Sequence, residues 1–595
     1  MKWQLTVPLA LLAQLSHCSQ KAPGLATVVS SQTASNTSYD FIIAGGGVSG
    51  LTVADRLTED PSVKVLVIEA GPFDKDEPSV LVPGSFFPVP YLWIPLPSTP
   101  QAALNGKTFN VPAGRVVGGG SVVNAMVFSE NSTAPNPEFA KSANFSYVEE
   151  VHGHSGPVQV SFPNFYYPAS GNWFEAAVSS GISVSGDPND GNARGICYFP
   201  SVTDFTTRTR SHARLNHYTR VQPRANYHIL DSHTVSRVLF NKKKVAIGVE
   251  YQPSSGGALL TARATKEVLL AAGAVHTPQV LQLSGIGPAK LLQKFSIDVV
   301  ADLPGVGANF HDQPSLLIPY NVSTSDIAKP NFGSLSDPSY DAAAKKQYED
   351  SRTGPYVITR GLSTNLAIPP LRDVTPKWKS LVAAARENDF AKYLPADTHP
   401  TVLKGYKKQR DLTLEQLENE TPVHMLSWNT HTEARIYFLR PLSRGTVTIN
   451  STDVLTTPLI DFRTMSDPID TELILTALLK NREIMSQPAM SSLGLKELSP
   501  FGEHITDENE LKKLLANVVE PSSAHQCCTA AMMPKSLGGV VDEMMSVHDV
   551  KGLRVIDTSY WPMVLTAAPT ATTYASGEKI ADVIKKEYGL GKVDP

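Results

Sequence analysis

The spacing of apolar residues early in the chain predicts a strand, a turn, a helix and a second strand. Residues 41–44 (FIIA) form a short apolar run of the kind found in buried strands. Residues 51–57 follow without proline or glycine, as is typical of a helix. A second apolar run within residues 64–71 (KVLVIEAG) predicts a strand that ends at Glu69.

Later segments extend this alternation of strands and helices. Residues 268–281 (VLLAAGAVHTPQVL) indicate a buried strand, a glycine turn and a helix. Residues 443–454 alternate apolar and polar positions, which predicts a half-buried strand. Residues 341–352 and 508–519 have helical composition, and we expect their charges to lie on solvated faces. No internal repeat is found.

Three glycines between the first strand and its helix suit a nucleotide. Gly45, Gly47 and Gly50 fit the pattern G-x-G-x-x-G, in which backbone approaches a pyrophosphate at a helix N-terminus. Glu69 follows Gly50 by nineteen residues, where an acid accepts hydrogen bonds from a ribose and disfavours a 2′-phosphate. The alternative is a glycine-rich turn without a ligand. These residues alone do not separate NAD from FAD.

Length and charge limit the function classes. With 595 residues the chain is too long for one core, so two or more domains are expected. The formal net charge is -4 and no long Lys/Arg run occurs, which argues against nucleic acid as a partner.

The N-terminus predicts a secretory signal peptide at residues 1–19. Lys2 precedes an apolar stretch, Leu5 to Leu15, that is too short to span a bilayer and is followed by small residues. The alternative is a buried first helix. Six Asn-x-Ser/Thr sites support the secretory route. They are Asn36, Asn131, Asn144, Asn321, Asn419 and Asn450. We therefore expect a secreted glycoprotein with no membrane segment after cleavage.

The cysteines do not indicate a disulfide framework. If Cys18 leaves with the signal, Cys197, Cys527 and Cys528 remain, so at least one thiol is free or bonds another chain. Adjacent cysteines rarely bond each other, because the ring is strained. No metal-binding Cys/His spacing is present, and no metal is expected.

Four segments resemble the signatures of the glucose–methanol–choline (GMC) oxidoreductases, in particular those of secreted fungal members. Residues 114–128 (GRVVGGGSVVNAMVF) and 273–288 (GAVHTPQVLQLSGIGP) are similar to the two family signatures. Residues 302–314 (DLPGVGANFHDQP) resemble the loop that follows, and 525–562 resemble the C-terminal catalytic segment. The resemblance extends from about Tyr39 to Tyr588.

The resemblance implies an α/β fold: a Rossmann-like FAD-binding domain with an α+β substrate-binding domain. The FAD-binding domain is expected to be discontinuous, from residues 39–130, 228–312 and 520–590. The substrate domain is expected from residues 151–227 and 313–519.

The resemblance also implies FAD as cofactor. The pyrophosphate is expected over the three glycines, with Glu69 on the adenosine ribose. Ser121 and Asn124 are expected to line the flavin side, although they could instead only cap a helix. Val235 is expected to meet the adenine by its backbone, and Asp557 precedes the turn that packs on the isoalloxazine.

Family members oxidise an alcohol: a base takes the hydroxyl proton while a hydride passes to flavin N5. O2 or another acceptor then reoxidises the flavin. His525 matches the catalytic base, a role that suits an imidazole of pKa near ~6.5. A second residue, usually His or Asn, stands at the entry to the last helix, where this chain has Ala568, which lacks a polar side chain. Gln526 or a neighbouring thiol could supply the missing contact.

A second departure from the family follows Phe128. The expected Arg-Gly, the Asp-Tyr-Asp-x-Trp stretch and several tens of residues of helix are absent. The gap is either a real shortening, which would open the site to solvent, or a wrongly joined gene model.

Three functions are consistent with these residues. The first is oxidation of a hydrophobic or aromatic alcohol, an intermediate of fungal specialised metabolism. The second is cyclase, dehydratase or lyase chemistry with structural FAD, which Ala568 favours. The third is an inactive flavin-binding protein.

Overall fold

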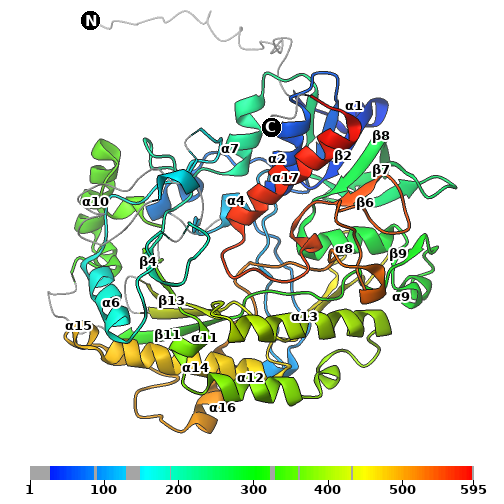
Figure 1. Ribbon diagram of the computed structural model, residues 1–595. Coiled ribbons are helices and arrows are strands. Elements are labelled where there is room, and N and C mark those ends of the chain that lie inside the picture. Colours follow the sequence, from blue (N-terminus) through cyan, green and yellow to red (C-terminus); the bar gives the residue numbers. More distant parts are fainter. Residues whose placement is uncertain are drawn as a thin grey trace, which may run out of the picture.

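Two β-sheets organise the part of the chain that the structure describes (Figure 1). The computed structural model describes residues 27–85, 90–128, 148–153, 155–187, 189–321, 329–359, 362–429 and 433–591. The expected signal peptide with Cys18, the sites Asn131 and Asn144, and the segment directly after Phe128 lie outside the described residues.

The first sheet has eight strands and a parallel centre. Its order is β1-β5-β3-β2-β8-β7-β6, and β18 pairs with β8. The strands are β1 (Thr27–Val28), β2 (Ser38–Ala44), β3 (Val65–Ile68), β5 (Tyr227–Leu230), β6 (His233–Phe240), β7 (Ala246–Pro253), β8 (Leu260–Leu270) and β18 (Leu553–Val555). Only β7 pairs in antiparallel fashion, with β6 and β8. The continuous apolar runs in β2 and β3 are buried on both faces, as a parallel sheet requires.

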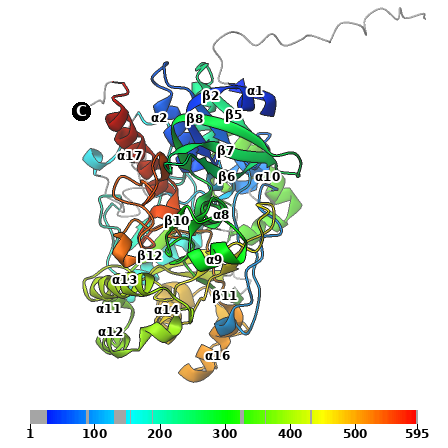
Figure 2. The same cartoon turned by 90° about the vertical axis from the view of Figure 1, so that its right-hand side faces the viewer.

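Helices cover both faces of this sheet. Phe41 and Ile43 of β2 pack in one core with α2 (Val48–Leu57) and α17 (Thr570–Tyr588). Ile42 and Ala44 point the opposite way, into a core shared with α8 (Gly273–Leu283). Figure 2 shows α17 beside α2, where a Cβ on Gly577 would lie 2.9 Å from Thr52. The strand–turn–helix–strand prediction for residues 41–69 is confirmed.

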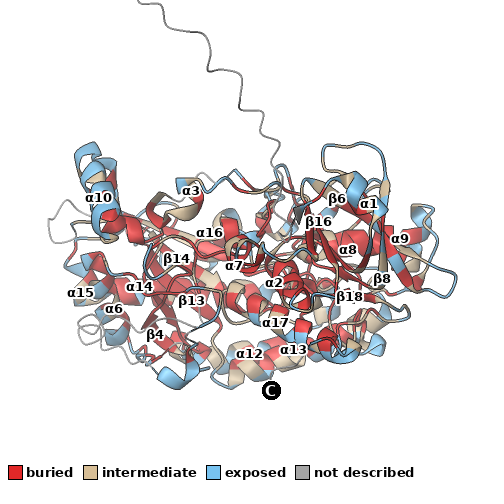
Figure 3. Cartoon of the chain, turned by 90° about the horizontal axis from the view of Figure 1, so that it is seen from above, coloured by how far each residue is buried: buried red, intermediate tan, exposed pale blue. Residues whose placement is uncertain are grey.

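The second sheet has six antiparallel strands, in the order β17-β11-β14-β13-β12-β4. They are β4 (Gly195–Tyr198), β11 (Ser315–Asn321), β12 (Asn365–Ile368), β13 (His424–Asn429), β14 (Glu433–Phe438) and β17 (Lys496–Glu497). Alternate residues of β14, Ala434, Ile436 and Phe438, are buried in a core with α14 (Pro468–Ser486). Figure 3 shows this interior as buried, in contrast to the exposed α10. The opposite face of β14 is left for Arg435 and Tyr437.

The remaining elements are mostly short. The other α-helices among the described residues are α1 (Ser31–Asn36), α3 (Pro78–Leu81), α4 (Gly120–Val123), α6 (Pro168–Ser179), α7 (Ala213–His217), α9 (Ala289–Lys294), α10 (Pro338–Ser351), α11 (Leu371–Val374), α12 (Trp378–Glu387), α13 (Pro400–Glu418), α15 (Pro488–Ser491) and α16 (Glu508–Val518). Two small sheets pair β9 (Ile286–Gly287) with β10 (Ala301–Asp302), and β15 (Thr446–Thr448) with β16 (Leu459–Asp461). The helices α10 and α16 and the alternating strand β15 confirm three sequence predictions.

The fold is therefore α/β, with a Rossmann-like parallel sheet beside an antiparallel sheet and its helices. Most strands of the first sheet come from residues 39–130, 228–312 and 520–590. Those of the second come from residues 151–227 and 313–519. Within the described residues, no helix combines the length and apolar character that crossing a membrane requires.

Candidate active site

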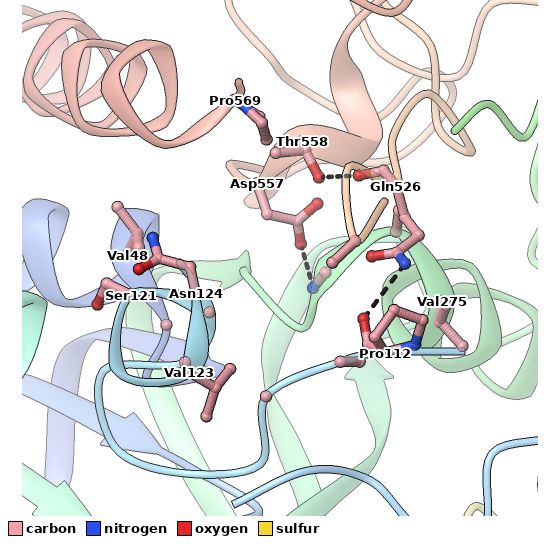
Figure 4. Close-up of a pocket in the computed structure, with 18 of the residues that line it drawn as sticks. Val48, Pro112, Ser121, Val123, Asn124, Val275, Gln526, Asp557, Thr558 and Pro569 are labelled. Carbon is pink, nitrogen blue, oxygen red and sulfur yellow. Dashed lines mark hydrogen bonds between the residues drawn. The ribbon is translucent and has the colours of Figure 1, made fainter. Parts of the chain in front are cut away.

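A cavity of about 880 Å³ is lined by residues from both sheets. One part is formed by the turn after β2, the end of β3, α4 and the start of α8. Another is formed by residues 522–526, the start of α17 and the six-stranded sheet. Figure 4 shows Ser121 and Asn124 on one side of this cavity and Gln526, Asp557 and Pro569 on another.

The glycine turn after β2 leaves open space at one position. A Cβ on Gly45 would lie 2.2 Å from the carbonyl oxygen of Ala271, and one on Gly50 would lie 2.1 Å from that of Gly45. These two glycines therefore allow β2, α2 and β8 to approach closely. A Cβ on Gly47 would meet no atom within 4 Å, and Gly47 lines the cavity at the N-terminus of α2. This opening is where a pyrophosphate rests in such a motif.

Glu69 lies at the end of β3 and lines the same part of the cavity. Its carboxylate accepts hydrogen bonds from the backbone N–H of Gly46 at 2.7 Å and of Gly71 at 2.8 Å. Burial raises the pKa of Glu69 to about 7. Each carboxylate oxygen retains lone-pair capacity for a ribose hydroxyl.

Ser121 and Asn124 both line the cavity and also hold α4 in place. The Ser121 hydroxyl donates to the carbonyl of Gly118 at 2.6 Å and accepts from the N–H of Ala213 at 3.0 Å. Asn124 ends α4 and donates to the Thr570 hydroxyl of α17 at 3.2 Å. Neither side chain caps the helix N-terminus, whose cap residue is a glycine.

Val235 and Asp557 complete the set predicted for the cofactor. Val235 is a buried residue of β6 that lines the cavity. Asp557 accepts hydrogen bonds from the N–H of Gly273 at 2.9 Å and from the Thr277 hydroxyl at 2.5 Å. It therefore joins the C-terminal segment to the start of α8 (Figure 4). Burial raises its pKa.

His525 is held by one side-chain hydrogen bond whose direction is fixed. The Gln313 amide nitrogen donates to the carbonyl oxygens of Leu565 at 2.7 Å and Ala567 at 3.4 Å. The amide oxygen of Gln313 therefore faces His525 Nδ1, at 2.6 Å. Because that oxygen can only accept, Nδ1 carries the proton. The other nitrogen, Nε2, has no hydrogen-bond partner within the described residues, and the ring lines the cavity.

Asp312, the residue before Gln313, fixes the backbone of the segment that carries His525. One carboxylate oxygen accepts from the N–H groups of Gln313 at 2.7 Å, His525 at 3.1 Å and Ser523 at 3.3 Å. The other accepts from the Ser522 hydroxyl at 2.5 Å. Asp312 is buried, which raises its pKa to about 6.

Burial lowers the pKa of His525 to about 4. This value lies well below the ordinary value of 6.5 for an imidazole. The imidazole is therefore neutral at neutral pH, and Nε2 is an acceptor ready to take a proton.

Ala568 lines the same cavity as His525, one residue before the cap of α17. It adds no polar group there. The Gln526 amide nitrogen donates to the Pro112 carbonyl at 3.2 Å and the Ser522 hydroxyl at 2.9 Å. This nitrogen is therefore already engaged with the protein, although Gln526 lines the cavity.

The expectation for the adjacent cysteines was wrong. Cys527 and Cys528 form a disulfide, and both are fully buried against Trp561 and Val564. Cys528 has a φ of 79°, a bend that lets consecutive side chains meet. No thiol at these positions can then serve the cavity. Among the described residues, the free cysteine is Cys197, which is buried, and burial raises the pKa of its thiol to about 12.

His311 lies against this disulfide, and the three residues bring their possible metal-ligand atoms within 4.8 Å of one another. The imidazole is already engaged on both sides. Its Nδ1 accepts from the N–H of Val564 at 3.1 Å, and its Nε2 lies 3.1 Å from the Asn309 amide oxygen. The cluster is therefore structural.

Sequence reasoning missed Gln313 as the partner of His525. The signal was present, because residues 302–314 stood out as a family-like loop, but nothing local showed what that loop contacts. It also missed the cavity face of the six-stranded sheet, formed by Ser315, Met425, Arg435 and Tyr437.

Sequence profiles of the GMC oxidoreductases match residues 39–315 with the N-terminal part of the family and 441–577 with the C-terminal part. The chain belongs to the GMC oxidoreductase family. The family resemblance of the four sequence segments and the predicted fold class are thereby confirmed.

Several GMC relatives match over nearly the whole chain. Dehydrogenase xptC from Emericella nidulans is 43% identical over 95% of this chain and 96% of its own. Oxygen-dependent choline dehydrogenase from Pseudomonas aeruginosa is 30% identical over 93% and 95%. A solved FAD-dependent oxidoreductase from Chaetomium thermophilum is 47% identical, with a TM-score of 0.91 over 93% of this chain and 100% of that one. A fungal aryl-alcohol oxidase is 32% identical, with a TM-score of 0.84 over 93% and 99%.

FAD is the cofactor of this family, and the cavity fits it. The open Cβ position at Gly47 leaves room for phosphates, and the Glu69 carboxylate has capacity for a ribose. Val235 and Asp557 line the cavity as the resemblance requires. These residues would hold the nucleotide, with His525 in the same cavity.

We expect Gly47→Val to abolish retention of FAD while the protein still folds. A Cβ at this position would lie more than 4 Å from any atom of the described residues, and the added side chain would occupy the pyrophosphate position. The ratio of flavin to protein absorbance measures retention, and circular dichroism reports folding. The matched control is Gly50→Val, which should not fold, because its Cβ would lie 2.1 Å from the Gly45 oxygen. Full flavin content in Gly47→Val would refute this binding position.

We expect Gln313→Glu to shift the pH dependence of flavin reduction to higher pH. The base must be neutral, so in the native protein the rate should be constant at neutral pH and fall as pH drops through about 4. A carboxylate beside Nδ1 stabilises the imidazolium and should raise the inflection by about one pH unit or more. Anaerobic stopped-flow absorbance measures the rate. Gln313→Leu is the control and should slow the reaction without raising the inflection. An unmoved inflection in Gln313→Glu would show that Gln313 does not contact the base.

Proposed function

We propose that this protein oxidises an alcohol to a carbonyl compound, with His525 as the base. The observation that carries the proposal is the bare Nε2 of His525, in a cavity that also holds the open glycine cradle. Bound FAD supplies the hydride acceptor for such a reaction. The electrons then pass to O2 or to another acceptor.

His525 performs the proton step in this proposal. Its Nε2 takes the hydroxyl proton, while Gln313 holds the Nδ1 proton in place and stabilises the ring orientation. A positioned base of this kind contributes roughly 10²–10⁴-fold to a rate. Because Ala568 provides no second polar side chain, His525 acts with little help at the substrate oxygen.

The cavity walls support an aromatic or hydrophobic alcohol as substrate. Leu92, Trp93, Phe332, Leu362 and Met425 all line the cavity. The ring centroids of Trp93 and His276 also lie 4.3 Å apart. The aryl-alcohol oxidase among the relatives supports this class. We place the substrate in fungal specialised metabolism.

A second candidate function is a non-redox reaction on the same scaffold, in which His525 transfers a proton while FAD stays structural. Ala568 is the observation that favours it, because alcohol oxidation in the family ordinarily uses a polar residue at that position. In this case a product forms without reduction of the flavin.

We also propose that the protein is secreted and N-glycosylated. The signal-like residues 1–19 support this, as does the exposure of the four sequence sites that the structure describes. These sites are Asn36, Asn321, Asn419 and Asn450.

We expect aromatic primary alcohols to bleach the absorbance of bound flavin under anaerobic conditions. The measurement is the visible spectrum of the holoenzyme during titration with benzyl alcohol, 4-methoxybenzyl alcohol and cinnamyl alcohol, with the matching aldehydes as controls. Bleaching by alcohols and not by aldehydes supports oxidation. Product formation from an alcohol without bleaching would support the non-redox candidate instead.

We expect His525→Ala to slow flavin reduction by roughly 10²–10⁴-fold, with little loss of bound FAD. Ala568→Asn should accelerate it by up to about two powers of ten, because one buried hydrogen bond contributes on the order of 1–3 kcal/mol. Single-turnover stopped-flow measures both variants. If both rates equal that of the native enzyme, neither side chain faces the reaction. If the native reaction is non-redox, Ala568→Asn should leave turnover unchanged or lower it.

A further inference from the structure

The wall contributed by the six-stranded sheet carries a positive charge. Ser315, Tyr437 and Met425 lie side by side on β11, β14 and β13, with Tyr437 in register with the other two. All three line the cavity. Arg435 is two residues before Tyr437 on β14, so the pleat places it on the same face. It also lines the cavity.

Arg435 is the only arginine or lysine among the described residues that line this cavity. Its Nη2 donates to a Glu520 carboxylate oxygen at 3.2 Å. Its Nε is shielded from solvent and has no hydrogen-bond partner among the residues that the structure describes. The guanidinium also lies 5.8 Å from the centre of the Tyr437 ring. A guanidinium binds a carboxylate best through two parallel N–H bonds, and Glu520 takes only one.

The ion pair with Glu520 is exposed and does not prevent Arg435 from binding a ligand. The Glu520 side chain is 56% exposed and that of Arg435 is 26% exposed. Pairs this exposed contribute little to stability. The Arg435 side chain is partly exposed and lines the cavity, so a ligand carboxylate inside the cavity would form a charge-assisted hydrogen bond with the accessible part of the guanidinium.

A short segment, residues 520–525, connects the partner of Arg435 to His525. The backbones of Glu520 and Ser315 exchange two hydrogen bonds of 2.9 Å, which fix Glu520 beside β11. The chain then runs five residues to His525, a span of at most about 17 Å. A molecule of one to a few aromatic rings can therefore reach both ends, with Phe332, Leu362 and Met425 available to its apolar body.

We propose that Arg435 binds an anionic oxygen of the substrate, at the end remote from the alcohol that His525 deprotonates. The substrate class is an aromatic alcohol that carries a carboxylate or an ionised phenol. This inference rests on the proposed alcohol oxidation for the position of the alcohol, but the binding of the anion does not require turnover.

The test measures equilibrium binding of two matched ligands to the oxidised holoenzyme, through the change that they cause in the flavin spectrum. The ligands are biphenyl-4-carboxylate and its methyl ester. Arg435→Met should raise the Kd of the carboxylate about 10- to 100-fold and leave that of the ester within about twofold. Arg435→Lys should recover part of the loss, because it restores the charge but not the planar fork.

Two further variants sharpen the result. Glu520→Gln should tighten binding of the carboxylate, because it removes a competing acceptor. Arg372→Met is the matched control, since Arg372 pairs with Glu420 at 3.0 Å and does not line this cavity. It should change neither Kd. Flavin content and melting temperature equal to those of the native protein show that each variant is folded.

Equal Kd values for the carboxylate in the native protein and Arg435→Met would overturn the inference, as would equal losses for acid and ester. Failure of the proposed function has a different signature. If Arg435 controls binding of the carboxylate but no alcohol reduces the flavin, the anion site stands and the oxidation does not. If benzyl alcohol reduces the flavin but Arg435 has no effect on the acid, the oxidation stands and the anion site does not.

Discussion

The buried carboxylate of Asp312 is the interaction on which the site depends. Among the described residues no cation pairs with it, and three backbone N–H groups and one hydroxyl satisfy it instead. Hydrogen bonds to the charged form are one of the few ways to keep a carboxylate inside a protein. Two of the N–H donors belong to the segment that carries His525, so the loop takes the shape that satisfies this charge. The position of His525 therefore follows from the hydrogen bonds that satisfy the Asp312 carboxylate.

This arrangement also joins the two halves of the molecule. Residues 302–314 run from β10, in the small sheet with β9, to β11 of the six-stranded sheet. Their backbone pairs with the loop that carries His525 through His311 and Cys527. The cradle for the nucleotide lies on one sheet and the wall with Arg435 on the other. The disulfide beneath the loop adds a covalent constraint at the same place. The cavity is therefore built where three distant parts of the chain must meet.

The sequence predicted what is encoded locally. The order of strand, glycines, helix and Glu69 lies within thirty residues, and its spacing alone carries the geometry. His525 could be found because a family motif surrounds it. Gln313 could not be assigned a role, since its partner is 212 residues away in sequence. The alternation in residues 433–438 marks two faces of a strand but does not show which face meets a cavity. The prediction for Cys527 and Cys528 was wrong for another reason. It relied on the general strain of such a ring and did not consider the positive φ that Cys528 adopts.

The amide of Gln313 has a consequence for how this enzyme can vary. Its oxygen accepts a hydrogen bond from His525, and its nitrogen donates to the carbonyls of Leu565 and Ala567, directly before Ala568. A substitution at 568 that shifts this backbone would also shift the amide, and His525 would move with it. Positions 313, 525 and 568 thus form one epistatic unit, whose substitutions do not combine additively. Directed evolution of this pocket should randomise the three together, because single-site libraries would sample only variants that the other two already tolerate.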